Sequence, residues 1–213
     1  MPHKNLDLDL FMMCRSLNSS AFSRLPDGYR FRHCRRAELD TWLVFPFDDA
    51  ETAAAHREFM EQYYERVYAA RSGEFFARCI FVVDAADTPI ATAFLWTAHG
   101  NITTLHWFKV KKSHEGLGIG RALLTYILNA AAPMDFPVFL HTQSGSHRAI
   151  KLYSDFGFEL LVDPQIGPRK NALQDALPVL ENAMSPEHFA ALKTSSAPED
   201  FIAAVAKAET LEF

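Results

Sequence analysis

The sequence predicts one mixed α/β (α+β) domain, built on a mainly antiparallel sheet that is flanked by helices. Three strand-like runs follow one another with short hairpin-type links, at residues 75–84, 90–98 and 102–110. A glycine-rich loop and an amphipathic helical pattern come directly after them. With 213 residues, 49% of them hydrophobic, the chain is large enough for one full-sized core.

Charge is unevenly distributed along the chain. The net charge is −5, and from Asn171 onward seven acids stand against two lysines, so residues 1–170 are neutral. Nucleic-acid-binding domains carry basic patches, so we expect no nucleic-acid partner. No apolar run approaches the ~18–20 residues of a membrane-spanning helix, and the acidic N-terminal run is too short for a signal peptide. We therefore expect no membrane segment.

The three cysteines are scattered and lack C-x-x-C spacing. This pattern indicates neither a disulfide framework nor a zinc site, and it favours a reducing cytoplasm. We expect no metal centre. The cysteines are Cys14, Cys34 and Cys79.

Composition divides the chain into three parts. Residues 1–27 form an N-terminal arm, in which Leu6–Leu10 alternates as in a strand. Residues 28–163 hold the most regular patterns. Residues 164–213 form an acidic helical extension that prolines interrupt.

Before the sheet pattern we expect a short strand and two helices. The second helix, N-capped by Asp48 or Asp49, runs to about Arg71 and stops at Gly73. The first strand and the first helix cover residues 29–34 and 37–44.

After the glycine loop, helices and short strands alternate. The tail then shows helical patches that Pro178, Pro186 and Pro198 break, with a linker at Thr194–Ser196. The expected elements are helix 122–132, strand 138–142, a helix from Ser144 to Phe156, strand 158–162 and helical patches at 173–184, 186–192 and 198–209.

The chain is organised around the glycine loop Glu115–Ala122. Three glycines alternate with two aliphatic residues, and a basic residue opens the following helix. Free N–H groups and the dipole at a helix start favour a phosphate ligand. The P-loop spacing fails at Arg121–Ala122, and a Rossmann fingerprint would need glycine at Arg121 or Leu123. The loop therefore belongs to neither of these two nucleotide-binding types.

The loop instead resembles the acetyl-coenzyme A loop, [QR]-x-x-G-x-[GA], of the GNAT N-acetyltransferases. Downstream, Ser146–Phe158 is similar to that family's N-x-x-A-x-x-L-Y-x-x-x-G-F. The two motifs stand in the same order with a strand between them, and the resemblance spans about Tyr29 to Val162. It implies a GNAT-type fold and acetyl-CoA as the cosubstrate.

Two positions depart from the family pattern. Glu115 stands where the family has Gln or Arg, and its carboxylate repels a phosphate. Lys111, Lys112 and Arg121 are close enough in sequence to offset that charge. Ser146 replaces the family's Asn and reaches less far.

The resemblance also implies which residues bind acetyl-CoA. The strand of residues 108–110 splays from the strand of residues 140–142, so that its backbone pairs with the pantetheine arm. The glycine loop then holds the pyrophosphate. The expected cofactor-binding residues are Phe108, Lys109, Val110, Glu115, Gly116, Leu117, Gly118, Ile119, Gly120, Arg121 and Ser146.

For catalysis, Tyr153 matches the family's tyrosine that protonates the leaving thiolate, although its helical stripe also fits a core residue. His106 is a candidate base, because it points to the same face as Phe108 if no bulge intervenes. A core histidine is an equal interpretation. His141, on the facing strand, is a further candidate.

Three acids, Asp48, Asp49 and Glu51, precede the long second helix. In GNAT-like proteins this region of the chain often lines the acceptor pocket. These acids either select a cationic amine or stabilise the helix start. The family's last strand is not evident after Val162. Its place can be taken by a short strand at Gln165–Ile166, by Leu6–Leu10 or by a second subunit.

We therefore expect a cytoplasmic, acetyl-CoA-dependent N-acetyltransferase that acts on a primary amine of a small molecule or protein, with a homodimer as one option. The alternatives are transfer of a longer acyl group or transfer to a hydroxyl, a non-catalytic acyl-CoA-binding module, and an interaction protein that uses the acidic tail.

Overall fold

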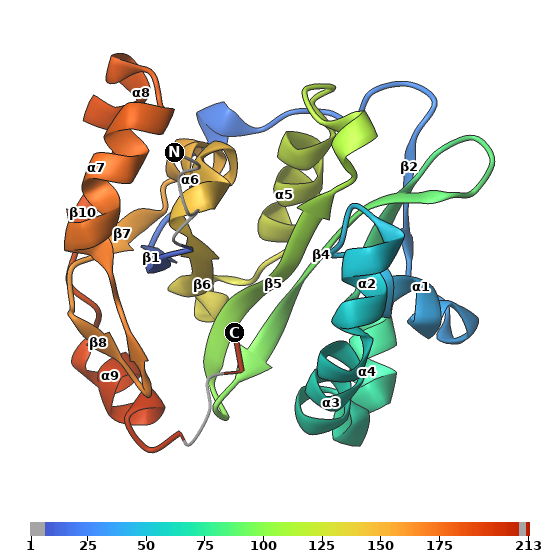
Figure 1. Ribbon diagram of the computed structural model, residues 1–213, viewed down its shortest axis with the longest axis horizontal. Helices are drawn as coiled ribbons and strands as arrows, with labels where there is room; N and C mark the ends of the chain where they lie inside the picture. Colours follow the sequence, from blue (N-terminus) through green and yellow to red (C-terminus); the bar gives the residue numbers. More distant parts are fainter. Residues whose placement is uncertain (1–6, 209–211) are drawn as a thin grey trace. The chain divides into compact units, whose positions relative to one another are not determined.

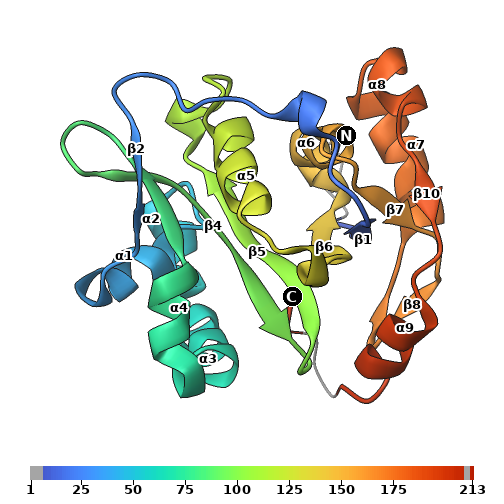
Figure 2. The same ribbon diagram turned by 180° about the vertical axis from the view of Figure 1, so that it is seen from behind.

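A computed structural model describes residues 7–208 and 212–213, and the chain divides into two compact units. The first unit combines residues 1–21, 97–105 and 131–213, and the second combines residues 22–96 and 106–130. Strands β4 (Pro89–Ala98) and β5 (Ile102–Val110) run through both units (Figures 1 and 2). Helices flank a mainly antiparallel sheet, which confirms the predicted fold class. The predicted division into an N-terminal arm, a central domain and a C-terminal extension, with boundaries at residues 27 and 163, stays a prediction.

In the second unit the strand order is β5-β4-β3-β2. The β2–β3 and β3–β4 pairs are antiparallel. The remaining elements are β2 (Arg30–His33), β3 (Ile80–Val83), α1 (Leu39–Val44), α2 (Ala50–Ala55), α3 (Arg57–Val67), α4 (Ser72–Arg78), α5 (Ile119–Asn129) and the 3-10 turns η2 (Arg36–Glu38), η3 (Ala69–Arg71) and η4 (Lys112–His114).

One face of this second-unit sheet is covered by an aromatic cluster. The ring of Tyr68 lies 4.9 Å from that of Trp96 on β4, and neither side chain is exposed. On the other face, Phe31 of β2 stacks on Tyr126 of α5 with 4.3 Å between ring centroids. All four residues of β3 are buried, so both faces of the sheet are covered at that strand. The central members of the aromatic cluster are Trp42, Tyr68, Phe75, Phe94 and Trp96.

The strand predicted from residue 75 is wrong at its start. Residues Ser72–Arg78 form helix α4, and the strand is only Ile80–Val83. Phe75 is fully buried against Trp42, with ring centroids 4.9 Å apart. The Phe75-Phe76-Ala77 run has no alternation that defines a strand face, and this packing places it in a helix.

The long helix predicted to end at Gly73 is also divided. Asp49 does cap a helix start, because its carboxylate accepts a hydrogen bond from the Thr52 N–H at 2.8 Å. The helix then breaks at His56, where φ is −105°, and the chain continues as α3 and η3. Gly73 lies inside α4 instead of ending a helix. Tyr68 and Phe75 are fully buried on either side of η3, and this packing outweighs the local stop signal at Gly73.

In the first unit the strand order is β10-β7-β1-β6-β5, and β8 and β9 form a separate hairpin. Among the described residues of this unit, β10 pairs with β7 and β5 with β6 in parallel, whereas β1 pairs with β6 and β7 in antiparallel orientation. The elements are β1 (Asp9–Cys14), β6 (Val138–Gln143), β7 (Glu159–Leu161), β8 (Gln165–Ile166), β9 (Arg169–Lys170), β10 (Thr194–Ser195), α6 (His147–Asp155), α7 (Leu173–Ala183), α8 (Pro186–Ala190), α9 (Glu199–Val205) and the 3-10 turns η1 (Ser19–Ala21), η5 (Pro133–Asp135) and η6 (Ser144–Ser146).

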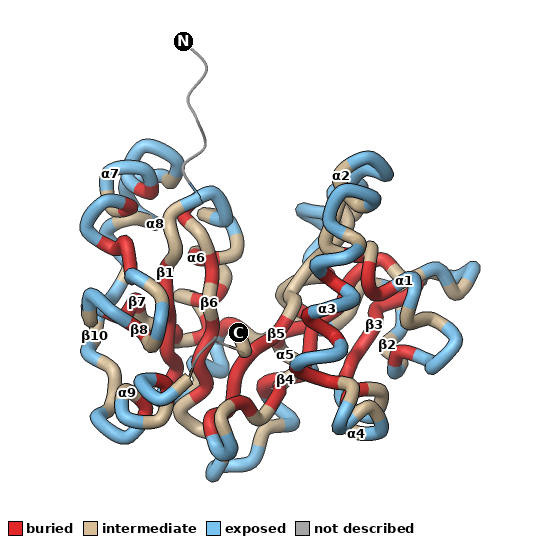
Figure 3. Tube along the Cα trace, turned by 60° about the horizontal axis from the view of Figure 1, so that its bottom comes forward, coloured by how far each residue is buried: buried red, intermediate tan, exposed pale blue. Residues whose placement is uncertain are grey.

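Strand β1 lies in the interior of the first-unit sheet, between β6 and β7. Residues 10–14 are all buried, as Figure 3 also shows. An apolar run without alternation is typical of a strand that is covered on both faces. Of the predicted alternating stretch, Leu10 lies in this strand, whereas Leu6 lies outside the described residues. The short strand at Gln165–Ile166 is present, but it pairs with β9 in a separate hairpin.

Two features of the tail differ from the sequence-based expectation. Pro178 lies within α7 and does not break it, because burial of residues such as Leu173 and Leu180 holds both halves of this helix against the unit. Thr194–Ser195, predicted as a linker, is strand β10 and pairs in parallel with β7. Both differences arise from tertiary contacts, which local helix and strand propensities do not predict.

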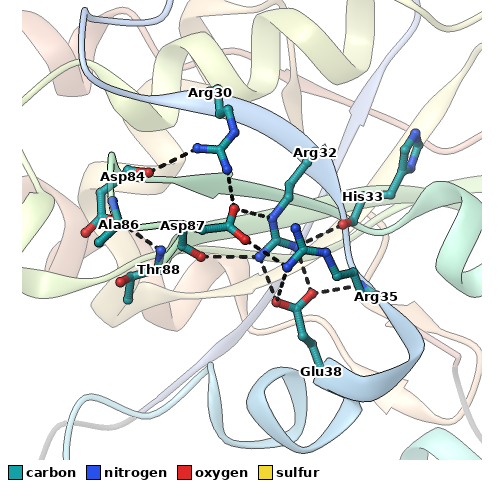
Figure 4. A network of polar contacts seen from close by, with 9 residues as sticks. All are labelled: Arg30, Arg32, His33, Arg35, Glu38, Asp84, Ala86, Asp87 and Thr88. Carbon is teal, nitrogen blue, oxygen red and sulfur yellow. Dashed lines mark hydrogen bonds and ion pairs between the residues drawn. The ribbon is translucent and has the colours of Figure 1, made fainter.

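A polar network ties the β3–β4 hairpin to β2 in the second unit (Figure 4). Arg32 forms two hydrogen bonds of 2.7 Å to the Glu38 carboxylate and one of 2.9 Å to Asp87. Arg30 and Arg35 also contact Asp87 from more exposed positions. The side chains of Arg32 and Glu38 are 13% and 18% exposed, so their paired carboxylate and guanidinium are largely shielded from water.

We predict that Arg32→Met lowers the free energy of unfolding by about 1–2 kcal/mol at pH 7, between the values for exposed and buried ion pairs. The hydrogen bonds from Arg32 hold the pKa of Glu38 below its usual value of 4.5. A carboxyl group whose pKa is lower in the folded state stabilises above its unfolded pKa and loses that effect as pH falls.

The difference in stability between wild type and Arg32→Met should therefore shrink as the pH is lowered from about 5 to about 3, in urea unfolding at each pH. Arg30→Met is the matched control, since the Arg30 side chain is 52% exposed. This variant should lose less unfolding free energy than Arg32→Met. A difference that stays constant down to pH 3 contradicts this account.

Candidate functional site

The glycine loop that follows β5 depends on two left-handed backbone positions. Gly116 has φ of +78°, and Gly118, the N-cap of α5, has φ of +81°. Residues with a Cβ atom disfavour this region, so both positions need glycine. The need comes from backbone conformation, because a Cβ atom on Gly116 would meet nothing within 4 Å.

The start of α5 is open to solvent at this loop. Residues 115–118 are exposed, whereas Ile119 is 1% exposed and anchors the helix start. The first N–H groups of a helix have no carbonyl one turn earlier, and the helix dipole adds partial positive charge there. The loop and the helix start together therefore fit a phosphate or pyrophosphate group.

Charged side chains around the loop are mixed in sign. Glu115 is exposed next to Gly116 and brings a carboxylate to the mouth of the loop. Of the cations expected to offset it, Lys111 lies over the ring of Phe45, 5.4 Å from its centroid. Lys111 thus contacts an aromatic ring, while the carboxylate of Glu115 adds negative charge beside the loop.

The backbone of β5 departs from regular strand geometry at Trp107, and we interpret this departure as a bulge. Trp107 has φ of +50°, a conformation that bulky residues rarely adopt, and holding it there costs about 1–3 kcal/mol. In a regular strand His106 and Trp107 would point to opposite faces. Here the Trp107 indole N–H donates to the Tyr68 hydroxyl at 3.0 Å, and His106 Nδ1 hydrogen-bonds the same hydroxyl. The bulge therefore brings both side chains to one side.

This bulge changes the basis of the prediction for His106. The prediction placed His106 on the same face as Phe108 only if the strand was regular. His106 is 2% exposed and lies in the aromatic cluster, 5.6 Å from Phe94 between ring centroids. The strand-face argument thus no longer applies, and the role of His106 as a base stays a prediction.

The side chains that follow the bulge lie at half-buried positions. Residues 108–110 are intermediate in exposure. The Lys109 ammonium forms an ion pair of 2.8 Å with Asp48, the acid that precedes α2. Since Asp49 caps α2, two of the three acids proposed to select a cationic amine already have partners. The third, Glu51, is exposed.

In the first unit, Tyr153 lies on α6 and is 6% exposed. Burial raises the pKa of its hydroxyl above the ordinary value. A phenol in this state keeps its proton at neutral pH, as a proton donor must, but the same burial fits a core tyrosine. Ser146 is exposed at the N-cap of the same helix. The roles of Tyr153 and Ser146 stay predictions.

His141 is held by two charged partners in the first unit. Its Nε2 lies 2.8 Å from the Asp9 carboxylate, and the Arg169 guanidinium lies 3.2 Å from its Nδ1. The hydrogen bond from His141 lowers the pKa of Asp9. Both ring nitrogens are thus engaged, which ties β1, β6 and β9 together.

The predicted residues fall into two groups. The second unit brings together His106, residues 108–110 and the loop 115–121, whereas the first unit contains Ser146 and Tyr153. Sequence analysis missed Tyr68, which lies four residues after Tyr64 and so continues the helical stripe. It also missed Asp9 and Arg169 as partners of His141. No local pattern marks these contacts, because each joins segments that are far apart in the sequence.

Two further features concern the described residues only. Residues 7–208 and 212–213 contain no group of three or more His, Cys, Asp or Glu side chains that could hold a metal ion. In the same residues, no helix is long and apolar enough to cross a membrane.

Comparisons with known proteins agree with the loop and the fold. The model of the acetyltransferase (GNAT) family matches residues 36–158. An acetyltransferase of the GNAT family from Colwellia psychrerythraea is similar in structure, with a TM-score of 0.52 and 16% identity over 72% of this chain and 53% of that one. A GCN5-related N-acetyltransferase from Sphaerobacter thermophilus has a TM-score of 0.50 and 16% identity over 72% of this chain and 49% of that one.

The chain thus spans about half the length of these two solved structures. At 16% identity they are evidence for the fold alone. No curated protein matches the chain.

Proposed function

Because this chain belongs to the GNAT acetyltransferase family, we propose that it is an acetyl-CoA-dependent N-acetyltransferase that acts on a primary amine. The observation that carries the proposal is the glycine loop, with Gly116 and Gly118 in the left-handed region at the start of α5. This arrangement fits the pyrophosphate of coenzyme A. The backbone of residues 108–110, directly before the loop, is proposed to pair with the pantetheine arm.

Acetyl-CoA supplies the acetyl group as a thioester that an amine can attack. An aliphatic amine with a pKa near ~10 is mostly protonated at pH 7, a deficit of roughly 4 kcal/mol for the neutral form. The protein therefore needs a group that accepts a proton from the amine and one that gives a proton to the thiolate. We propose Tyr153 as the donor and His106 as the candidate acceptor, directly or through water.

The acceptor is proposed to be a small molecule or a protein with a free amino group. The ion pair between Asp48 and Lys109 supports no strong selection for extra positive charge, because the carboxylate is already balanced. Fold alone does not identify an acceptor. Thiol release measured across a panel of neutral, cationic and peptide amines would identify the class.

We predict that Gly118→Ala weakens acetyl-CoA binding about tenfold or more in isothermal titration, because an alanine strains the left-handed N-cap and moves the N–H groups that face the phosphates. Gly100→Ala is the matched control. Gly100 has φ of +88°, with no atom within 4 Å of an added Cβ atom, and it lies in the β4–β5 turn.

Both substitutions should lower stability by a similar amount, about 1 kcal/mol, and only Gly118→Ala should lower affinity. Absence of acetyl-CoA binding by the wild type contradicts the proposed function. Binding without thiol release for any amine would instead support a non-catalytic acyl-CoA-binding module.

We predict that Tyr153→Phe lowers kcat by about 100-fold and changes the Kd for acetyl-CoA by less than about twofold, since only the proton donor is removed. Steady-state thiol release and titration calorimetry measure the two quantities. Tyr126→Phe is the control, because Tyr126 is 45% exposed on α5. Unchanged kcat in Tyr153→Phe would refute the role of Tyr153.

A further inference from the structure

Tyr68 stands out as a buried polar group that the proposed chemistry does not use. Its side chain is 0% exposed, and it follows α3 as the C-cap residue. Burial raises the pKa of its hydroxyl well above the ordinary value. A buried hydroxyl is retained only where it has hydrogen-bonding partners.

Two of its partners are consecutive residues of β5, and Tyr63 is a further hydrogen-bonding partner. The Trp107 indole N–H can only donate, so the Tyr68 oxygen accepts that hydrogen bond at 3.0 Å. His106 Nδ1 hydrogen-bonds the same hydroxyl. Consecutive residues of a regular strand point to opposite faces, so one hydroxyl can reach both only when the strand is bulged.

The bulge needs such support because of the residue that carries it. Tryptophan has a Cβ atom and a large ring, and it disfavours a φ of +50°. The ring of Tyr68 is itself fixed, since Trp42, Phe94 and Trp96 lie within 5.7 Å of it, centroid to centroid. The hydroxyl is therefore presented to β5 from a rigid position.

The bulge lies directly before the proposed coenzyme A contacts. The ladder between β5 and β6 comprises Thr103–Val138 and Thr104–Phe139, and Trp107 follows three residues after Thr104. The direction of each N–H and C=O group in residues 108–110 depends on the backbone at Trp107, because a bulge changes the twist of the strand that follows it.

We propose that Tyr68 is a positioning residue: its hydroxyl holds β5 in the bulged conformation through Trp107 and His106, and thereby orients the backbone of residues 108–110 toward coenzyme A. This inference rests on the proposed function for its ligand. Tyr68 is not proposed to contact the acetyl group or the amine, although its hydroxyl hydrogen-bonds His106, the candidate proton acceptor.

Tyr68→Phe tests the proposal, because it removes only the hydroxyl from the aromatic cluster. Tyr64→Phe is the matched control, since Tyr64 is 7% exposed in the same helical segment and its ring lies 6.1 Å from that of Tyr68. Two quantities are measured: the Kd for coenzyme A by calorimetry, and the indole ¹H–¹⁵N signal of Trp107, assigned with Trp107→Phe, in the ligand-free chain.

We expect Tyr68→Phe to shift the Trp107 indole signal, to speed its hydrogen exchange and to weaken coenzyme A binding about tenfold or more. Tyr64→Phe should leave the indole signal and the Kd as in the wild type. A Tyr68→Phe variant with an unchanged indole signal and an unchanged Kd overturns the proposal. So does an equal loss of affinity in Tyr64→Phe, because it would indicate a general packing effect.

A rescue experiment separates positioning from loss of stability. Glycine adopts positive φ without strain, so in a Trp107→Gly background the bulge no longer needs the hydroxyl. There, Tyr68→Phe should cause no further loss of affinity, whereas a full second loss would refute the mechanism. If the Trp107→Gly chain does not fold, the indole signal of Tyr68→Phe still decides.

The experiments distinguish failure of the proposed function from failure of the positioning role of Tyr68. If the wild type binds no coenzyme A, the proposed function is wrong, and the indole signal alone then tests whether Tyr68 holds the bulge. If the wild type binds coenzyme A and Tyr68→Phe behaves as the wild type in both measurements, the proposed function stands and the positioning role is wrong.

Discussion

The second unit depends on hydrogen bonds that are made inside an aromatic core. The hydroxyl of Tyr68 has no access to water, and its bonds to Trp107 and His106 satisfy polar groups that would otherwise destabilise this core. Both hydrogen bonds can form at once only because β5 is bulged at Trp107. Because the glycine loop follows β5 after η4, the place of Gly116 and Gly118 depends on a contact made at the end of α3.

The first unit depends on a different constraint, the pairing of β1 between β6 and β7. Every residue from Leu10 to Cys14 is buried, and the strand pairs with residues more than 120 positions later in the chain. The bonds of His141 to Asp9 and Arg169 support the same arrangement. Helix α6, which carries Tyr153, lies between β6 and β7 in the sequence, so β1 stabilises the strands on either side of it.

The charged residues beside the loop and before α2 do not indicate which acceptor the protein uses. The loop offers partial positive charge from α5, yet Glu115 adds a carboxylate beside it. Asp48 and Lys109 neutralise each other, and Asp49 is used to cap α2. Asp48, Lys109 and Asp49 therefore serve local structure.

The sequence by itself determined the order of most elements and the glycine loop, for which it predicts a phosphate-bearing ligand, because turn glycines, caps and hydrophobic periodicity are local signals. Its second motif also made Tyr153 a candidate proton donor, a role that stays a prediction. Only the tertiary structure decided that residues 72–78 are helical, that β1 lies inside the sheet and that β5 is bulged at Trp107. All three differences have the same physical reason, which is that contacts between distant segments override local preference. These contacts are the burial of Phe75, the pairing of β1 and the hydrogen bonds of the Tyr68 hydroxyl.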